Sequence, residues 1–159
     1  MKISRQRTNK VLLSITVVVL LVPVAVAIFH LKRNSDTTVS AALDHSCDLH
    51  QGTCQSLFPG GSRVSLSIEP RPIKGLKPLQ IQVQTEGIKT QSVEVDFRGI
   101  GMNMGYNRPK LKRESEGNYS GTWVLAACAL ERMFWEATVL IKNDQGVMSA
   151  PFRFEVTTP

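Results

Sequence analysis

Apolar and polar residues alternate in several short segments of the chain, beginning near residue 64. Val64, Leu66 and Ile68 are separated by serines, and the same period of two recurs from Leu79 and from Val93. Because successive side chains of a β-strand point to opposite faces, this pattern predicts strands with one buried face. Turn residues separate these segments from further predicted strands at residues 108–113, 119–125, 134–141 and 152–156.

The predicted strands number about seven, and no amphipathic helix lies between them. Short strands that follow one another at this spacing favour two packed antiparallel sheets. The sequence therefore predicts a mainly β fold, an immunoglobulin-like β-sandwich, over residues 62–159. Residues 32–61 lack the alternation, and we expect them to form a tether and a cysteine-containing loop region.

A different pattern precedes this domain, because residues 11–31 contain no charged side chain. A helix of that length rises about 30 Å, the thickness of the hydrocarbon core of a bilayer. The positive-inside rule then predicts a basic cytoplasmic tail at residues 1–10, a transmembrane signal-anchor at residues 11–31 and an exported domain. Pro23 and the Ala25-Val26-Ala27 run leave open a cleaved signal peptide, which would export the same domain.

The net charge of +6 belongs to the membrane-flanking part of the chain. Six of the 19 basic residues and none of the 13 acidic residues lie in residues 1–33, so the rest of the chain is balanced. Proteins that bind nucleic acid carry an excess of basic residues on the binding domain. The charge distribution therefore predicts no nucleic-acid partner.

Three cysteines, Cys47, Cys54 and Cys128, permit one intramolecular disulfide and leave one thiol over. Cys47 and Cys54 are close in sequence and form the easiest pair, although a bridge from Cys54 to Cys128 is an open alternative. The thiols of all three are also candidate ligands for a soft metal ion. Six residues separate Cys47 from Cys54, which is wider than the usual pairs of zinc ligands.

Met102 and Met104 lie in a glycine-rich segment, residues 99–105. In an extended chain their spacing of two places both thioethers on one side. Thioether and thiolate ligands select Cu(I), so both residues are candidate metal ligands. The alternative is that both side chains fill gaps at the rim of the sandwich, as methionine often does.

The sequence contains no nucleophile elbow, phosphate-binding loop or HExxH motif. Glu131 and Glu136 are five residues apart on a predicted turn and strand, a spacing that fixes no acid–base pair. We therefore expect that the protein is not an enzyme.

The order of features resembles the YtkA-like and FixH-like families of membrane-anchored bacterial envelope proteins. The matching residues follow a single predicted N-terminal span and are Gly101-Met102-Asn103-Met104-Gly105, Glu116-Gly117-Asn118-Tyr119-Ser120-Gly121 and Trp135-Glu136-Ala137-Thr138-Val139. The resemblance covers residues 62–156 together with the span.

This resemblance implies a single-pass protein of the bacterial inner membrane whose periplasmic domain supports copper handling or respiratory oxidase assembly. Its expected cargo is Cu(I), and its expected partner is a respiratory oxidase or a copper-delivery protein. The alternative function is that of a non-metal protein-interaction module of the bacterial envelope.

Overall fold

A computed structural model describes residues 22–23, 37–126 and 132–157 of the 159-residue chain. The chain divides into two compact units, Met1–Asp36 and Thr37–Pro159. Apart from residues 22–23, the predicted transmembrane segment and the basic tail lie outside the described residues. In the part of the chain that is described, no helix has the length and apolarity needed to cross a membrane.

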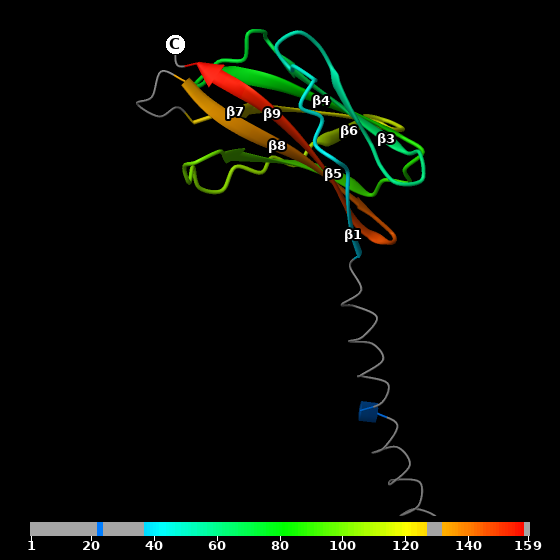
Figure 1. Ribbon diagram of the computed structural model, residues 1–159. Coiled ribbons are helices and arrows are strands. Elements are labelled where there is room, and N and C mark those ends of the chain that lie inside the picture. Colours follow the sequence, from blue (N-terminus) through cyan, green and yellow to red (C-terminus); the bar gives the residue numbers. More distant parts are fainter. Residues whose placement is uncertain (1–21, 24–36, 127–131, 158–159) are drawn as a thin grey trace, which may run out of the picture. The chain divides into compact units, whose positions relative to one another are not determined.

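The second unit, Thr37–Pro159, is mainly β and consists of two sheets (Figure 1). One sheet has four strands in the order β1-β9-β8-β5, and the other has five in the order β2-β3-β4-β7-β6. This confirms the predicted mainly β fold with two sheets. The strands are β1 Thr37–Ser40, β2 Cys54–Leu57, β3 Arg63–Glu69, β4 Pro78–Glu86, β5 Ser92–Gly99, β6 Lys112–Ser115, β7 Asn118–Val124, β8 Arg132–Asn143 and β9 Gly146–Thr157.

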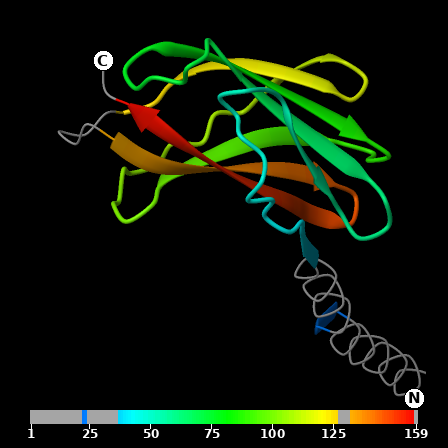
Figure 2. The ribbon, with the colours of Figure 1, turned by 45° about the horizontal axis from the view of Figure 1, so that its top comes forward.

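The core lies between the two sheets, whose ribbons face each other in Figures 1 and 2. Alternate residues of β4 and β5, such as Ile81 and Val95, are buried, while their sequence neighbours are mostly exposed or half-buried. Trp135 of β8 is the largest fully buried side chain. Full burial of a large apolar side chain stabilises the folded state by about 1.5–3 kcal/mol. The alternation in the sequence therefore records which face of each strand meets the core.

The described residues contain nine strands, whereas about seven were predicted. The additional strands β1 and β2 lie in residues 32–61, where the sequence predicted a tether and loops. β1 pairs in parallel with β9, with Thr37 opposite Gly146, and β2 pairs with β3. Both strands have only four residues, too few for a long alternating pattern. β1 depends on pairing with the distant strand β9, whereas β2 pairs with β3, the next strand in the sequence.

Residues 41–50 cover the edge of β9 that extends beyond β1. The Ala41 amide donates a hydrogen bond to the Ser149 carbonyl at 2.8 Å. Further along, His50 Nε2 lies 2.7 Å from the Glu155 carbonyl, and the Ile73 amide donates to His50 Nδ1 at 3.2 Å. An uncovered strand edge can pair with other chains, so this segment protects the four-stranded sheet on that side.

Candidate functional site

The segment that contains Met102 and Met104 is a loop at the end of β5, which we call the methionine loop (residues 100–106). After the loop, residues 107–111 run back along the free edge of β5. The Phe97 amide donates to the Asn107 carbonyl at 2.8 Å, and the Leu111 amide donates to the Val93 carbonyl at 2.9 Å. The loop is therefore the tip of a hairpin anchored to the four-stranded sheet.

Glycine and asparagine residues fix the conformation of the methionine loop. Gly101 and Gly105 have φ angles of 84° and 73°, in the left-handed region that favours glycine. Asn103 Oδ1 accepts a hydrogen bond from the Gly105 amide at 2.9 Å, and Asn107 Nδ2 donates to the Met104 carbonyl at 2.8 Å. These contacts hold the backbone that carries Met104.

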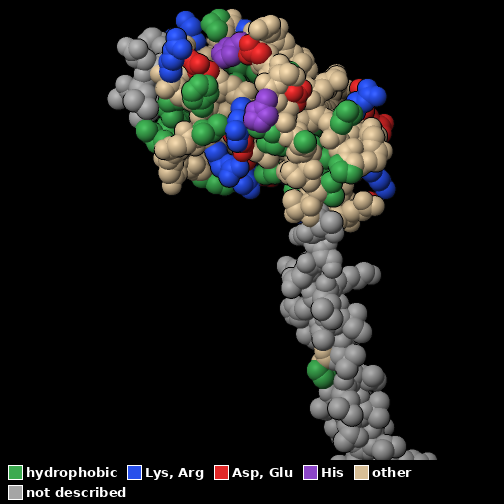
Figure 3. Space-filling view, viewed as in Figure 1, with side chains coloured by type: hydrophobic (Ala, Val, Ile, Leu, Met, Phe, Trp, Pro, Cys, Tyr) green, Lys and Arg blue, Asp and Glu red, His purple; other side chains and the backbone are tan. Residues whose placement is uncertain are grey.

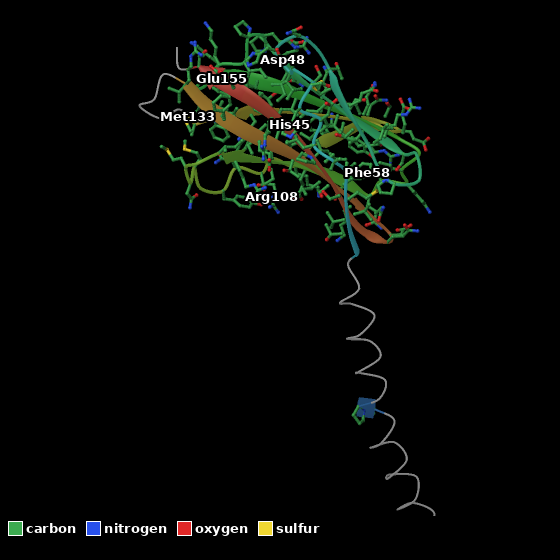
Figure 4. The ribbon with its side chains drawn as sticks, viewed as in Figure 1. His45, Asp48, Phe58, Arg108, Met133 and Glu155 are labelled. Carbon is green, nitrogen blue, oxygen red and sulfur yellow. A yellow bond between two sulfur atoms is a disulfide. The ribbon has the colours of Figure 1, made fainter. Side chains whose placement is uncertain are left out.

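The side chains of Met104 and Met133 both approach Gly99, the last residue of β5. A Cβ atom on Gly99 would lie 2.8 Å from Met104 Cγ and 3.5 Å from Met133 Cε. Met104 is half-buried against the core, and Met133 is buried at the start of β8 (Figure 4). Met102 lies on the same loop with an exposed side chain. The structure thus places three of the five methionines of the chain at one end of the sandwich.

An aromatic residue adjoins this methionine cluster, defined as Met102, Met104 and Met133. Trp135 is the direct cross-strand partner of Gly99 in the β5–β8 pair, and Met133 lies two residues before it on the same buried face. The indole N–H of Trp135 is buried without a hydrogen-bond partner among the described residues. Because Gly99 has no side chain, the space opposite Trp135 is open to Met104.

Sequence reasoning missed Met133, because it lies within an apolar strand that looks like ordinary core. The signal that could have indicated it is the period of two shared by Met133 and Trp135. That period places both on one face, but only the register of β8 against β5 brings them to Gly99.

The cysteines contribute differently from the methionines. Cys47 and Cys54 form a disulfide with a Cα–Cα distance of 5.7 Å, as the sequence predicted for this pair. Cys54 begins β2 in the five-stranded sheet, so the structure does not bring this pair to the methionine cluster. While oxidised, neither sulfur is a thiolate ligand. Cys128, the third predicted thiol ligand, lies outside the described residues.

Harder metal ligands do not gather in the described parts of the domain. No three His, Cys, Asp or Glu side chains of residues 37–126 and 132–157 lie together as a metal site would need. Both ring nitrogens of His50 contact backbone groups, as described above. The thioethers therefore form the only donor set at the candidate site that the described residues supply, and this set suits Cu(I) better than Zn²⁺ or Mg²⁺.

A chain of ion pairs crosses the outer face of the four-stranded sheet next to the methionine loop. Arg153 Nε lies 3.0 Å from Glu136 Oε2, and Arg98 contacts the other Glu136 oxygen at 3.0 Å. The Asp96 carboxylate forms ion pairs with two arginines: Arg98 Nε lies 3.7 Å from Asp96 Oδ2, and Arg108 Nε lies 3.2 Å from Asp96 Oδ1. The hydrogen bond from Arg108 to Asp96 raises the pKa of the Arg108 guanidinium above its ordinary value. These pairs tie the C-terminal stem of the loop to β5, β8 and β9.

A separate hollow of about 570 Å³ lies at the other end of β8, beside the turn to β9. Its lining includes Val39, Ile88, Lys89, Asp144 and Met148. Lys89 Nζ and Asp144 Oδ2 lie 3.6 Å apart, and both side chains are mostly exposed. The lining thus contains neither a buried charge nor a group of metal ligands, and it contains none of the candidate site residues.

Comparisons with known proteins identify no relative from which a function can be transferred. No family model matches the sequence, and no curated protein matches it. Among solved structures, the chain is similar to an engineered protein with 15% sequence identity and a TM-score of 0.45. That similarity covers 64% of this chain and 21% of the engineered protein, so this chain spans about a fifth of its length.

Proposed function

We propose that this protein is a membrane-anchored envelope protein whose immunoglobulin-like domain binds Cu(I) and supports copper handling or respiratory oxidase assembly. The observation that carries this proposal is that the Met104 and Met133 side chains both approach Gly99, since a Cβ atom placed there would lie 2.8 Å from Met104 Cγ and 3.5 Å from Met133 Cε. Met102 on the adjoining loop supplies a third thioether. Two methionine side chains that approach the same glycine, with a third on the loop, would provide a soft ligand set on a domain with no comparable cluster of harder ligands among its described residues.

The surroundings of the methionine cluster favour a monovalent, weakly hydrated ion. Met133 and Trp135 are buried, so a bound ion would lie partly shielded from water. Copper is the cargo of the protein in this proposal, and the residues proposed to hold it are Met102, Met104 and Met133. Cys128 precedes Met133 by five residues and is the candidate thiolate ligand.

The proposed location follows from the sequence of residues 1–33. In this proposal, residues 11–31 span the bacterial inner membrane once, with the N-terminus in the cytoplasm and the domain in the periplasm. The Cys47–Cys54 disulfide supports an oxidising compartment, because disulfides persist mainly outside the cytosol. Membership of the YtkA-like or FixH-like families is part of the same proposal, and it brings a respiratory oxidase or a copper-delivery protein as partner.

The alternative is a non-metal interaction module of the envelope. It is favoured by the exposed side chains of Ile100 and Tyr106 in the methionine loop and of Phe134 on β8. Neither proposal makes the protein an enzyme, since the sequence contains no nucleophile elbow, phosphate-binding loop or HExxH motif.

Titration of the purified full chain with Cu(I), in the presence of a competing chelator, tests the proposal. We expect one Cu(I) per chain, and a loss of affinity of about tenfold or more when Met104 or Met133 is replaced by Leu. Leu keeps the apolar volume and removes the sulfur, so the fold is preserved. Met148→Leu is the matched control, because Met148 lies at the hollow beside the other end of β8.

Two results would contradict the proposal. One is the absence of Cu(I) binding by the wild-type chain after its thiols have been kept reduced. The other is an equal loss of affinity in Met148→Leu and Met133→Leu, which would show that binding does not depend on the methionine cluster. Either result would leave the interaction module as the remaining function.

A further inference from the structure

Exposed apolar side chains of the described part of the domain gather around the methionine loop. Ile100, Met102, Tyr106 and Phe134 are 44%, 38%, 80% and 59% exposed, and they are four of the seven large exposed hydrophobic residues that the described part of residues 37–157 contains. The other three, Leu57, Leu76 and Val124, lie on the five-stranded sheet or its loops. Exposed apolar residues that gather in this way mark an interaction surface more often than scattered ones do.

These exposed apolar residues lie on segments that backbone hydrogen bonds join to the four-stranded sheet. The Ile100 amide donates to the Phe134 carbonyl at 2.8 Å, so the loop begins beside the exposed face of β8. On the other side of the loop, the Tyr106 ring lies 5.6 Å from the Arg108 guanidinium carbon. We call this region the docking surface. It consists of Ile100, Met102, Tyr106 and Phe134, together with the flanking Arg98, Arg108 and Arg132.

In the docking surface, the arginine side chains are more exposed than the carboxylates with which they pair. The side chains of Arg98 and Arg132 are 63% and 74% exposed, whereas the Arg98 partners Asp96 and Glu136 are 15% and 16% exposed. An approaching molecule therefore meets basic groups first. Figure 3 shows hydrophobic, basic, acidic and histidine side chains interspersed on the viewed side of the domain. Arginine, methionine and aromatic residues are the types enriched in protein–protein interfaces.

We propose that the docking surface binds a partner protein through a segment that presents an apolar side chain flanked by carboxylates. The apolar side chain would pack on Ile100 and Phe134, and the carboxylates would face Arg98 and Arg132. This inference rests on the proposed function, because the partner that gives or receives Cu(I) would dock beside the methionine cluster. Arg98 is already held by Asp96 and Glu136, which lowers the entropic cost of using it in recognition.

Site-specific photocrosslinking in the cells that naturally produce the protein tests this surface. The full chain carries p-benzoylphenylalanine in place of Phe134, and a second variant carries it in place of Leu57. Leu57 is the matched control, because it is 63% exposed but lies on β2 of the other sheet. We expect a discrete protein adduct from position 134 and none of the same mass from position 57. The cross-linked peptide, identified by mass spectrometry, should contain carboxylates beside an apolar residue.

A second arm replaces Arg98 and Arg132 with Gln in the chain that carries the photoreactive residue at position 134. The yield of the adduct should fall by about tenfold, which corresponds to the loss of two solvent-exposed ion pairs. The same variants should bind Cu(I) with wild-type affinity, because neither arginine is a proposed ligand and Arg108, on the stem of the loop, keeps its own ion pair with Asp96. Unchanged denaturation curves would show that they fold.

The inference is overturned by several results: no adduct at position 134, equal adducts at both positions, an adduct with lipid or with a second copy of this chain, or an adduct insensitive to the Arg→Gln changes. Failure of the proposed function is distinct, because it is an absence of Cu(I) binding in the titration. An adduct at position 134 without Cu(I) binding would support docking alone. Cu(I) binding without the adduct would support only the metal site.

Discussion

Met104 occupies the space that a side chain at Gly99 would fill, since a Cβ atom there would lie only 2.8 Å from Met104 Cγ. The Met102 carbonyl oxygen would lie 3.0 Å from the same Cβ atom, so backbone as well as side-chain atoms crowd this position. Gly99 is therefore required for the close approach of the loop. Its absent side chain leaves room for the Met104 side chain, which is half-buried against the core.

Gly99→Ala should consequently displace Met104 and destabilise the domain by about 1–3 kcal/mol, the usual cost of overpacking. If the proposed copper site forms there, Gly99→Ala should also lower its affinity for Cu(I), because Met104 would be displaced from its position beside Gly99. Chemical denaturation and Cu(I) titration of the full chain measure both effects. Gly52→Ala is the control: a Cβ there meets nothing within 4 Å, and stability should change by less than about 0.5 kcal/mol. Equal stabilities for the two variants would show that Gly99 is not crowded.

The disulfide should stabilise the domain through the loop it closes. Replacing both Cys47 and Cys54 with Ala should lower the free energy of unfolding by about 2.5 kcal/mol, according to the chain-entropy estimate for so short a loop. Denaturation of the wild-type chain with reductant should show a similar loss. The double variant itself should not respond to reductant. Wild-type stability that is unaffected by reductant would contradict this role of the disulfide.

The sequence predicted those strands whose order is encoded locally. Val93, Val95 and Phe97 alternate with charged residues, and this alternation matches the burial of β5 residue by residue. The same argument failed for β1, because Thr37 and its neighbours show no clear periodicity. Gly146, the residue of β9 that pairs with Thr37, is more than 100 residues away in the sequence, and such pairing depends on tertiary structure.

The candidate site was predictable only in part, for the same reason. Met102 and Met104 stand out in the sequence because glycines surround them, and the Cys47–Cys54 pair followed from short spacing. Met133 did not stand out, since it reads as a core residue. Only the pairing of Gly99 with Trp135 brings it to the loop, and strand register cannot be determined from composition or from the alternation alone.

Asp44 provides a test of pH dependence in the segment that covers β9. Its Oδ1 accepts hydrogen bonds from the Ser46 hydroxyl at 2.6 Å and the Ser46 amide at 2.8 Å. These bonds favour the carboxylate and hold the pKa of Asp44 below its ordinary value of 3.8. A carboxyl group with a lowered pKa stabilises the folded state above its unfolded pKa, and the contribution disappears as the pH falls through the folded pKa.

Ser46→Ala should therefore raise the pKa of Asp44 toward 3.8 and reduce stability only where Asp44 is ionised. Titration of the Asp44 carboxyl by NMR measures the pKa directly. Ser40→Ala serves as the control, because the Ser40 hydroxyl donates to the Ala41 carbonyl and not to Asp44. An unchanged pKa in Ser46→Ala would show that the hydroxyl bond does not form in solution.

His50 joins two backbone groups that are far apart in the sequence. Its Nδ1 accepts from the Ile73 amide, so in the neutral ring Nε2 carries the proton and donates to the Glu155 carbonyl. The disulfide loop that carries His50 is thereby attached to β9. Removal of the imidazole would leave a donor and an acceptor without partners in a half-buried site.

His50→Ala should thus destabilise the domain by about 1–3 kcal/mol, and His50→Gln should recover part of this loss, because an amide can also donate and accept. His45→Ala is the matched control, since His45 is exposed and should change stability by less than about 0.5 kcal/mol. Hydrogen exchange at the Ile73 amide separates the local effect from the global one: it should accelerate in His50→Ala beyond what the lower global stability explains. If the two Ala variants were equally stable and Ile73 exchanged at the same rate in both, the imidazole would not be the link between residues 47–54 and β9.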